Sequence, residues 1–205
     1  GLWAKQPRDF QDLSVGFGFI DDFLSFDDAS VRWLLTQAST GTAVCDVAAK
    51  GGVLLLDSAS STNNQGAQLQ LGGAAAASSF IASATSKIYY EARVKLADIG
   101  STTVQFFAGL SEIDSTLFAS AANSSANHVG AEAINTTALG VHSEKAGSRS
   151  SSASVHTIAD GTYFKIGFVI DGVSKVTPYV NGEAKTAITT NVPIVEMTPS
   201  FVCHS

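Results

Sequence analysis

The segment from Thr162 to Thr186 constrains the fold more than any other part of the chain. From Phe164 to Ile170 every second residue is large and apolar, and Asp171-Gly172 and Asn181-Gly182 interrupt the runs that follow. Period-two alternation places one row of side chains on a core and the other toward solvent. Asp-Gly and Asn-Gly accept the positive φ angles of tight hairpin turns. The segment therefore predicts an antiparallel meander.

Short apolar or alternating runs recur along the rest of the chain. The clearest is Ile88–Leu96, in which the even-numbered residues predict an interior row and the odd-numbered ones a solvated row. Weaker runs cover residues 31–35, 43–47, 53–56, 68–71, 104–110, 129–134, 138–142 and 155–158. Such spacing favours an all-β sandwich or barrel. Gly72–Ser79 and Ala146–Ser154 predict loops, and Leu117–Asn123 predicts a short helical turn.

The size and the net charge of the chain limit the classes of function that it can have. A chain of 205 residues fits one β-sandwich. The net charge of −6 argues against nucleic acid as a partner, because phosphate binding needs clustered Lys and Arg. Lys145 and Arg149 come nearest to a cluster, and they are interpreted as part of a solvated loop. No apolar stretch reaches the roughly 18 residues of a membrane span, so no membrane partner is expected.

Two other features leave alternatives open. Cys45 and Cys203 are either two buried free thiols or one disulfide bridge. The first sixteen residues, 1–16, show no consistent period and are either a disordered leader or an arm that orders on a partner. Trp3, Pro7 and Phe10 would anchor the arm to its partner.

A series of motifs along the chain resembles one known family. The motifs are Phe19–Phe23, Arg32-Trp33, 51–56, 87–96, 106–110, 160–164 and 179–183. In this order they resemble the concanavalin A-like (laminin G-like) jelly-roll domains found among tailed-bacteriophage virion proteins. The resemblance implies an all-β, two-sheet antiparallel jelly-roll sandwich over residues 17–205. It also implies that Phe201–Ser205 is the strand before a final return strand. Either that final strand is absent and leaves an unpaired edge strand, or a partner or the N-terminal segment completes the sheet.

Laminarinase-type glycosidases share this fold and carry Glu-x-Asp-x-x-Glu on a strand. Glu112 and Asp114 match its first two carboxylates, but the position of the third is Leu117. A retaining mechanism needs two carboxyl groups about 5 Å apart. We therefore interpret Glu112 and Asp114 as part of a polar turn, and we expect no catalytic residue and no enzyme.

Other site chemistry finds little support in the sequence. Asp57, Asn63, Asn64 and Asp114 supply oxygen atoms but no compact calcium motif, and the four histidines lack zinc-site spacing. No metal or cofactor is expected. Carbohydrate binding stays open, with Trp33, Tyr89 and Tyr179 as aromatic platforms and Asn63 and Asn64 as hydrogen-bonding groups, although each tyrosine is more simply interpreted as a half-buried strand residue.

The leading hypothesis from the sequence is a non-enzymatic virion protein that decorates or cements a phage capsid from its exterior. The expected partners are the major capsid protein and further copies of the chain, with a trimer as the expected oligomer. The alternative is a lectin-like module that recognises host surface glycans, and after it a laminarinase-type hydrolase.

Overall fold

The computed structural model describes residues 16–26, 32–39, 41–46, 48–58, 65–72, 80–99, 105–119, 122–123 and 126–205. Within these residues the regular secondary structure consists of strands. Trp3, Pro7, Phe10, Asn63 and Asn64 lie outside the described residues, so their predicted roles stay predictions.

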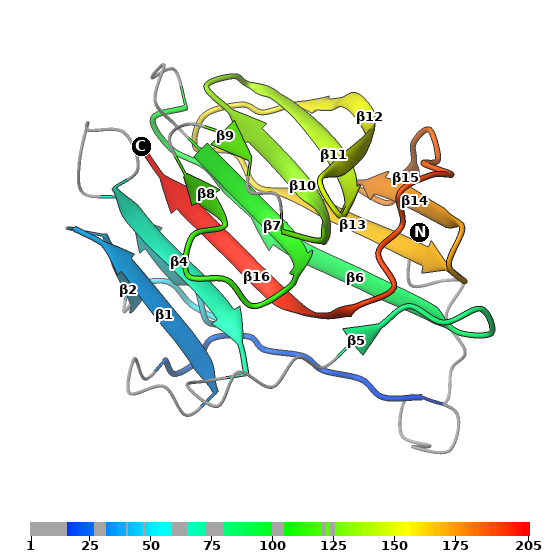
Figure 1. Cartoon of the computed structure of the whole chain (residues 1–205). Helices are drawn as coiled ribbons and strands as arrows, with labels where there is room; N and C mark the ends of the chain where they lie inside the picture. Colours follow the sequence, from blue (N-terminus) through cyan, green and yellow to red (C-terminus); the bar gives the residue numbers. More distant parts are fainter. Residues whose placement is uncertain are drawn as a thin grey trace.

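Two antiparallel sheets form the body of the molecule (Figure 1). The larger has the order β1-β4-β16-β7-β10-β11-β12, with β5 on β16, and the smaller has the order β15-β14-β13-β6. The larger sheet comprises β1 (Trp33–Ala38), β4 (Gly66–Leu71), β5 (Phe80–Ile81), β7 (Gln105–Ser111), β10 (His128–Ile134), β11 (Ala138–Lys145), β12 (Ser148–Thr157) and β16 (Glu196–His204). The smaller comprises β6 (Lys87–Val94), β13 (Phe164–Asp171), β14 (Lys175–Val180) and β15 (Glu183–Ala184). Two separate hairpins pair β2 (Thr42–Cys45) with β3 (Leu54–Asp57), and β8 (Phe118–Ala119) with β9 (Ala122–Asn123).

The main core lies between the two sheets, as the alternating rows predict. Phe164, Ile166, Phe168 and Ile170 of β13 are all buried in it. The even-numbered row of β6 packs against the same core, with Tyr90 buried inside. Gly172, Asn181 and Gly182 have φ angles of 66°, 49° and 83°, which confirms the two predicted turns.

A smaller core holds the N-terminal part of the described chain against the larger sheet. Trp33 is buried there with Leu69 and Leu71, and Phe19, Phe23 and Phe201 pack on them. The Trp33 Nε1–H donates to Asp21 Oδ2 at 2.8 Å. These contacts make Trp33 a core residue.

Three local predictions are wrong. Ala146–Ser154 is not a loop, because β12 begins at Ser148 and its backbone pairs with β11, which small side chains permit but do not signal. Leu117–Asn123 contains β8 and β9 instead of a helical turn. The C-terminal strand β16 is not an edge strand, because it pairs with β4 on one side and with β7 on the other.

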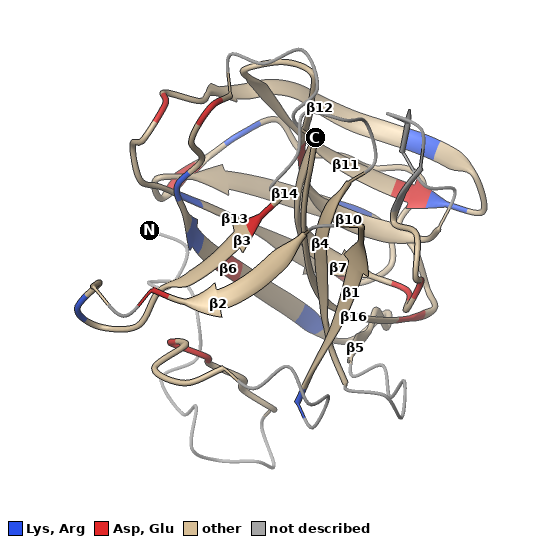
Figure 2. Cartoon of the chain, turned by 90° about the vertical axis from the view of Figure 1, so that its left-hand side faces the viewer, with Lys and Arg blue, Asp and Glu red and all other residues tan. Residues whose placement is uncertain are grey.

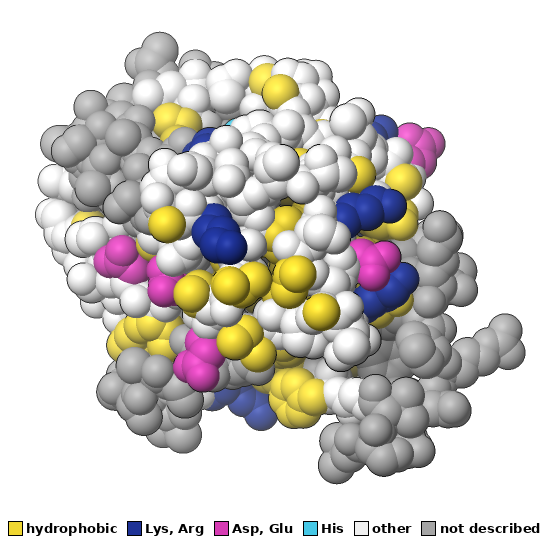
Figure 3. Space-filling model, turned by 45° about the vertical axis from the view of Figure 1, so that its right-hand side comes forward, with side chains coloured by type: hydrophobic (Ala, Val, Ile, Leu, Met, Phe, Trp, Pro, Cys, Tyr) yellow, Lys and Arg dark blue, Asp and Glu magenta, His cyan; other side chains and the backbone are white. Residues whose placement is uncertain are grey.

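The remaining features of the fold are the state of the two cysteines and the distribution of the charged side chains. Cys45 and Cys203 are both free thiols. Burial raises the pKa of Cys203 to about 11. Lys and Arg are spread over several separate strands and loops (Figure 2), and in Figure 3 a band of hydrophobic side chains crosses the face between groups of charged side chains.

A charged cluster on the outer face of the larger sheet

The larger sheet has an inner face toward the core and an outer face on which polar side chains collect. Alternation along β7 and β10 sends one row into the core and leaves the other row outside. The inner row includes Phe106, Ala108, Leu110, Val129 and Ala131. The outer row therefore includes Phe107, Ser111, His128, Gly130 and Glu132.

One half of this outer face is closed by the segment Glu112–Leu117, which follows β7. Gln70 Nε2 lies within hydrogen-bond distance of Ser111 Oγ, Ser200 Oγ and the Glu112 carbonyl oxygen, at 2.9–3.1 Å. Gln68 Oε1 accepts from the Leu117 N–H at 2.9 Å. The two glutamines of β4 thus tie the segment across β16 and β7.

An apolar contact seals the same half. Leu117 packs with Phe107 and Val202 in a small cluster of its own. The Phe107 ring lies over Gly130, where an added Cβ would come within 2.5 Å of ring atom Cε2. Because Gly130 has no side chain, the Phe107 ring can pack directly against the sheet.

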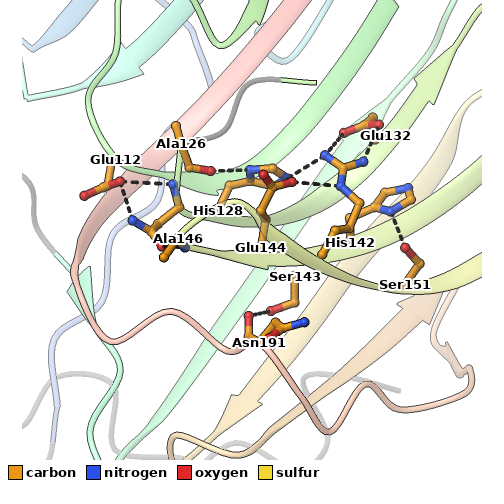
Figure 4. A network of polar contacts seen from close by, with 12 residues as sticks. Glu112, Ala126, His128, Glu132, His142, Ser143, Glu144, Ala146, Ser151 and Asn191 are labelled. Carbon is orange, nitrogen blue, oxygen red and sulfur yellow. Dashed lines mark hydrogen bonds and ion pairs between the residues drawn. The ribbon is translucent and has the colours of Figure 1, made fainter. Parts of the chain in front are cut away.

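The other half of the outer face, over β10 to β12, carries a cluster centred on Arg149 (Figure 4). The Arg149 Nε–H donates to Glu144 Oε2 at 2.8 Å, and Nη1 donates to Glu132 Oε1 at 3.0 Å. Nη2 adds a contact to Glu132 Oε2 at 3.4 Å. The side chains of Glu132 and Glu144 are 6% and 7% exposed. One guanidinium thus holds two buried carboxylates, which leaves one net negative charge.

His128 completes the cluster as a neutral imidazole. Burial is the main cause that lowers its pKa, and the Arg149 charge adds to this. Nδ1 lies 2.8 Å from the Ala126 carbonyl oxygen, an acceptor, so Nδ1 carries the proton. Nε2 is then free to accept from Arg149 Nη2 at 3.3 Å.

A second set of contacts fixes the edge of the cluster. Glu112 Oε2 accepts from the backbone N–H and the side-chain Nδ2 of Asn127, at 3.0 and 2.7 Å. Asn127 Oδ1 in turn accepts from the Ala146 N–H at 2.8 Å. These bonds join the segment after β7 to the β11–β12 turn (Figure 4). Glu112 therefore has a structural role in a polar turn, as its sequence context predicts.

His142 lies beside the cluster and is partly open to solvent. Its Nδ1 is 2.8 Å from Ser151 Oγ. Burial lowers its pKa from 6.5 to about 4, and the nearby Arg149 and His128 add to the effect.

This shift predicts a loss of stability in acid. The unfolded chain takes up a proton near pH 6.5 and the folded chain near pH 4, so stability is fully present above pH 6.5 and falls as the pH drops to 4. A difference of this size between the pKa values of the folded and unfolded chain corresponds to about 3 kcal/mol. We expect His142→Asn to flatten the fall in denaturant midpoint over this range. At pH 8 the two proteins should differ little, and an unchanged acid slope in the variant would contradict the assignment.

Of the aromatic residues predicted as sugar platforms, the two tyrosines share one face of a sheet and Trp33 lies elsewhere. Trp33 is buried in the smaller core. Tyr89 and Tyr179 lie on the smaller sheet, on strands that both flank β13. Tyr179 is only 8% exposed. The registers Tyr89↔Val169 and Tyr179↔Gly167 put both tyrosines on the outer face of the smaller sheet, and Trp33 lies apart from them.

The charged cluster is the feature that the sequence reasoning missed. Arg149 was expected in a solvated loop, but it lies in β12 and contacts two glutamates. A signal was present in β10, where His128 and Glu132 stand at even spacing in an otherwise apolar run. Even spacing puts both on one face of a strand, and charges facing a buried surface indicate a polar site.

The described residues offer neither a cluster of metal ligands nor a membrane-spanning helix. No group of three His, Cys, Asp or Glu residues there is arranged to hold a metal ion. In the same part of the chain, no helix has the length and apolar character to cross a membrane.

Comparison with solved structures places this arrangement in a known fold. A β-glucanase from Bacillus licheniformis is similar with a TM-score of 0.60 and 13% identity, over 90% of this chain and 83% of that one. A family 16 endo-glucanase from Bacteroides ovatus gives 0.55 and 12%, over 89% and 84%. A protein of unknown function from Shewanella oneidensis MR-1 gives 0.61 and 15%, over 98% and 87%. No family model and no curated protein matches the chain.

These neighbours confirm the all-β jelly-roll sandwich and correct one prediction. At such identities the likeness shows the fold alone. The expectation that the chain is not an enzyme is nevertheless contradicted, because the fold is shared over 90% of its length with a glucanase. Nothing in the comparisons connects the chain with virion proteins. The capsid partner, the trimer and the position on the capsid exterior stay predictions.

Proposed function

We propose that this protein is a carbohydrate-active protein that binds a neutral, glucan-type polysaccharide on the β10–β12 half of the outer face. The observation that carries the proposal is the cluster in which Arg149 holds Glu132 and Glu144 on that face. Its support from the fold is that the similar solved structures include β-glucanases.

The geometry of the face favours this half as the binding surface. Over β4, β16 and β7 the face is occupied by the Glu112–Leu117 segment. Over β10 to β12 the Arg149 side chain is 21% exposed, and His142 and Ser151 stand beside it. Guanidinium, imidazole and hydroxyl groups are suited to the hydroxyls of a sugar.

The charge of the cluster selects the class of glycan. Two carboxylates outweigh one guanidinium, and the whole chain carries a net charge of −6. A polyanionic glycan would be repelled by both. A neutral polysaccharide avoids this cost, so neutral glucans are the proposed ligands.

Hydrolysis is a second candidate, and the paired carboxylates favour it. Glycoside hydrolysis uses two carboxyl groups on either side of the scissile bond. Glu132 and Glu144 are the pair that this face offers, since Glu112 is engaged by Asn127. Both carboxylates accept from Arg149, so substrate binding would have to draw one away before it could serve as an acid.

Binding to mixed-linkage β-glucan, measured by affinity gel electrophoresis and calorimetry, tests the main proposal. We expect His142→Ala to weaken binding about tenfold, because a lost hydrogen bond to a sugar corresponds to about 1.4 kcal/mol. The matched control is Tyr89→Ala on the smaller sheet, which should bind as the parent does. If Tyr89→Ala loses binding and His142→Ala keeps it, the site lies on the other sheet and the proposal is wrong.

A reducing-sugar assay on the same polysaccharide tests hydrolysis. If sugar is released, Glu132→Gln and Glu144→Gln should each lower the rate by about a hundredfold or more. Glu112→Gln is the control and should retain the rate. Equal loss in all three variants would point to a folding defect, which the thermal melt of each variant identifies.

A further inference from the structure

A groove separates the smaller sheet from the β2–β3 hairpin. It has a volume of about 450 Å³, within the range of ligand sites in proteins. Six consecutive residues, Glu91–Leu96, line one side, and Gly51–Leu56 line the other. Because side chains alternate along a strand, consecutive lining residues mean that the groove follows the edges of β6 and β3. Residues of both strands thus line the same groove.

Both bordering edges lack a neighbour. β6 is the end strand of the smaller sheet and pairs only with β13, and β3 pairs only with β2. Among the residues that the structure describes, no strand pairs with the other edge of either one. Such edges present backbone N–H and C=O groups that are ready to bond an added strand.

The inner wall of the groove is apolar. Leu54, Leu56 and Val94 are only half-buried, and Phe106 and Phe201 line the groove behind them. An added strand would turn every second side chain toward this wall. Those side chains would therefore need to be apolar.

The outer rim beside β6 is cationic. Arg93 and Lys95 are both exposed, and they lie over the Tyr163 ring at 4.1 and 5.2 Å from its centroid. Glu91, on the same rim, is already paired with Lys165 at 3.3 Å. The rim thus offers two adjacent positive charges to the outward side chains of an added strand.

Three aspartates also line the groove, and each accepts a hydrogen bond from a neighbouring group. Asp21 accepts from Trp33 Nε1 and lies 3.5 Å from Arg32. Asp22 Oδ1 accepts from the Leu24 N–H, and Asp46 Oδ1 accepts from the Ala48 N–H. Arg32 thus compensates the Asp21 carboxylate, and backbone N–H groups orient the carboxylates of Asp22 and Asp46 without removing their charge. Within the described part of the chain, Arg93 and Lys95 lie against the Tyr163 ring.

We propose that this groove accepts one extended strand of a partner protein, with apolar and acidic residues in alternation. The apolar residues face Leu54, Leu56 and Val94, and the acidic residues lie beside Arg93 and Lys95. The added strand hydrogen-bonds to β6 on one side and to β3 on the other. The added strand joins the smaller sheet and the β2–β3 hairpin into one continuous sheet. The outward side of the added strand also covers Leu55, which is 50% exposed.

Three short synthetic peptides test the proposal on the full chain. One alternates Glu with Val, one alternates Lys with Val, and the third is the Glu/Val peptide with alternate backbone amides methylated. We expect the Glu/Val peptide to bind at least about tenfold more tightly than either of the others, by fluorescence anisotropy. It should also slow amide hydrogen exchange within 87–94 and 54–57. The Arg93→Glu/Lys95→Glu variant should reverse the charge preference, while Lys145→Glu/Lys175→Glu, with the same change in net charge, should keep it.

Four outcomes would overturn the proposal. Equal binding of the methylated peptide would mean that no backbone pairing occurs. Absence of binding by all the peptides, with the fold intact by circular dichroism, would mean that the groove takes no such strand. Protection of the same amides by laurate would assign the groove to a small amphiphile. Protection that rises with protein concentration in the absence of peptide would assign it to a second copy of the chain.

Discussion

Replacing Arg149 with alanine is expected to lower the free energy of unfolding by about 3–5 kcal/mol. The guanidinium donates to Glu144 at 2.8 Å and to Glu132 at 3.0 Å, and both carboxylates are almost fully buried. Without it, two negative charges remain close together in a poorly solvated place. Removing one partner of a buried ion pair costs more than the pair itself contributes, because the remaining charge loses its compensation. Urea denaturation at neutral pH measures the effect.

Two further variants separate charge from packing. Lys145→Ala, at the exposed turn before β12, is the matched control and should change stability by less than about 0.5 kcal/mol. The triple variant Glu132→Gln/Glu144→Gln/Arg149→Met removes all three charges and should recover most of the loss, since neutral replacements of a buried ion cluster are often tolerated. A loss below about 1 kcal/mol in Arg149→Ala would show that water reaches the carboxylates and that the cluster is not a buried one.

Phe168→Ala is expected to destabilise the protein by about 3–5 kcal/mol. Phe168 is fully buried in the main core and stacks on Tyr90, its cross-strand partner in β6, with ring centroids 4.9 Å apart. Truncation removes the ring from the centre of the smaller sheet and leaves a cavity that rigid strands on both sides cannot close. Thermal and urea melts should shift together.

Two comparison variants are informative, one in the exposed turn after β13 and one at the ring that stacks on Phe168. Val173→Ala, in the exposed β13–β14 turn, should be nearly neutral. Tyr90→Phe should be neutral or slightly stabilising, because the Tyr90 hydroxyl is buried and has no hydrogen-bond partner among the described residues. Burial also raises the pKa of that hydroxyl, so it stays protonated. A clear loss in Tyr90→Phe would mean that the hydroxyl has a partner, such as an internal water.

The position of the charged cluster links the fold to the proposed activity. A jelly roll exposes the outer face of each sheet, and on the larger sheet the Glu112–Leu117 segment covers part of that face and leaves β10 to β12. The polar side chains on those strands are held by one another: Arg149 by two glutamates, and His128 by Ala126 and Arg149. Such mutual support positions groups before a ligand arrives, which lowers the entropy cost of binding.

The strands with strong local patterns could be predicted from the sequence. In β13 the row Phe164, Ile166, Phe168 and Ile170 is buried as expected, and the turns at Gly172 and Asn181-Gly182 adopt the positive φ angles that their residues favour. The strand β12 could not be predicted, because its Ser-rich first half has no apolar alternation and gains its order from pairing with β11.

The candidate site was much harder to predict than the strands. Glu112 and Asp114 attracted attention because they match a local motif, yet their side chains cap nearby backbone groups. Arg149 contacts Glu132, which lies 17 residues away, and the contact depends on the pairing of β10 with β11 and of β11 with β12. A shift in the register between Leu139 and Val141 lies within that path. No local pattern encodes such a shift.

The sequence by itself determined the all-β class, the buried rows of β6 and β13 and the positions of the tight turns. These are local properties, since the two-residue repeat and the φ angle follow from the backbone of one short segment. Only the tertiary structure decided that β16 lies in the middle of a sheet, that Arg149 meets Glu132 and Glu144, and that β6 and β3 face each other across a groove. Those facts depend on which strands pair and in which register, and pairing is settled by contacts between residues far apart in the chain.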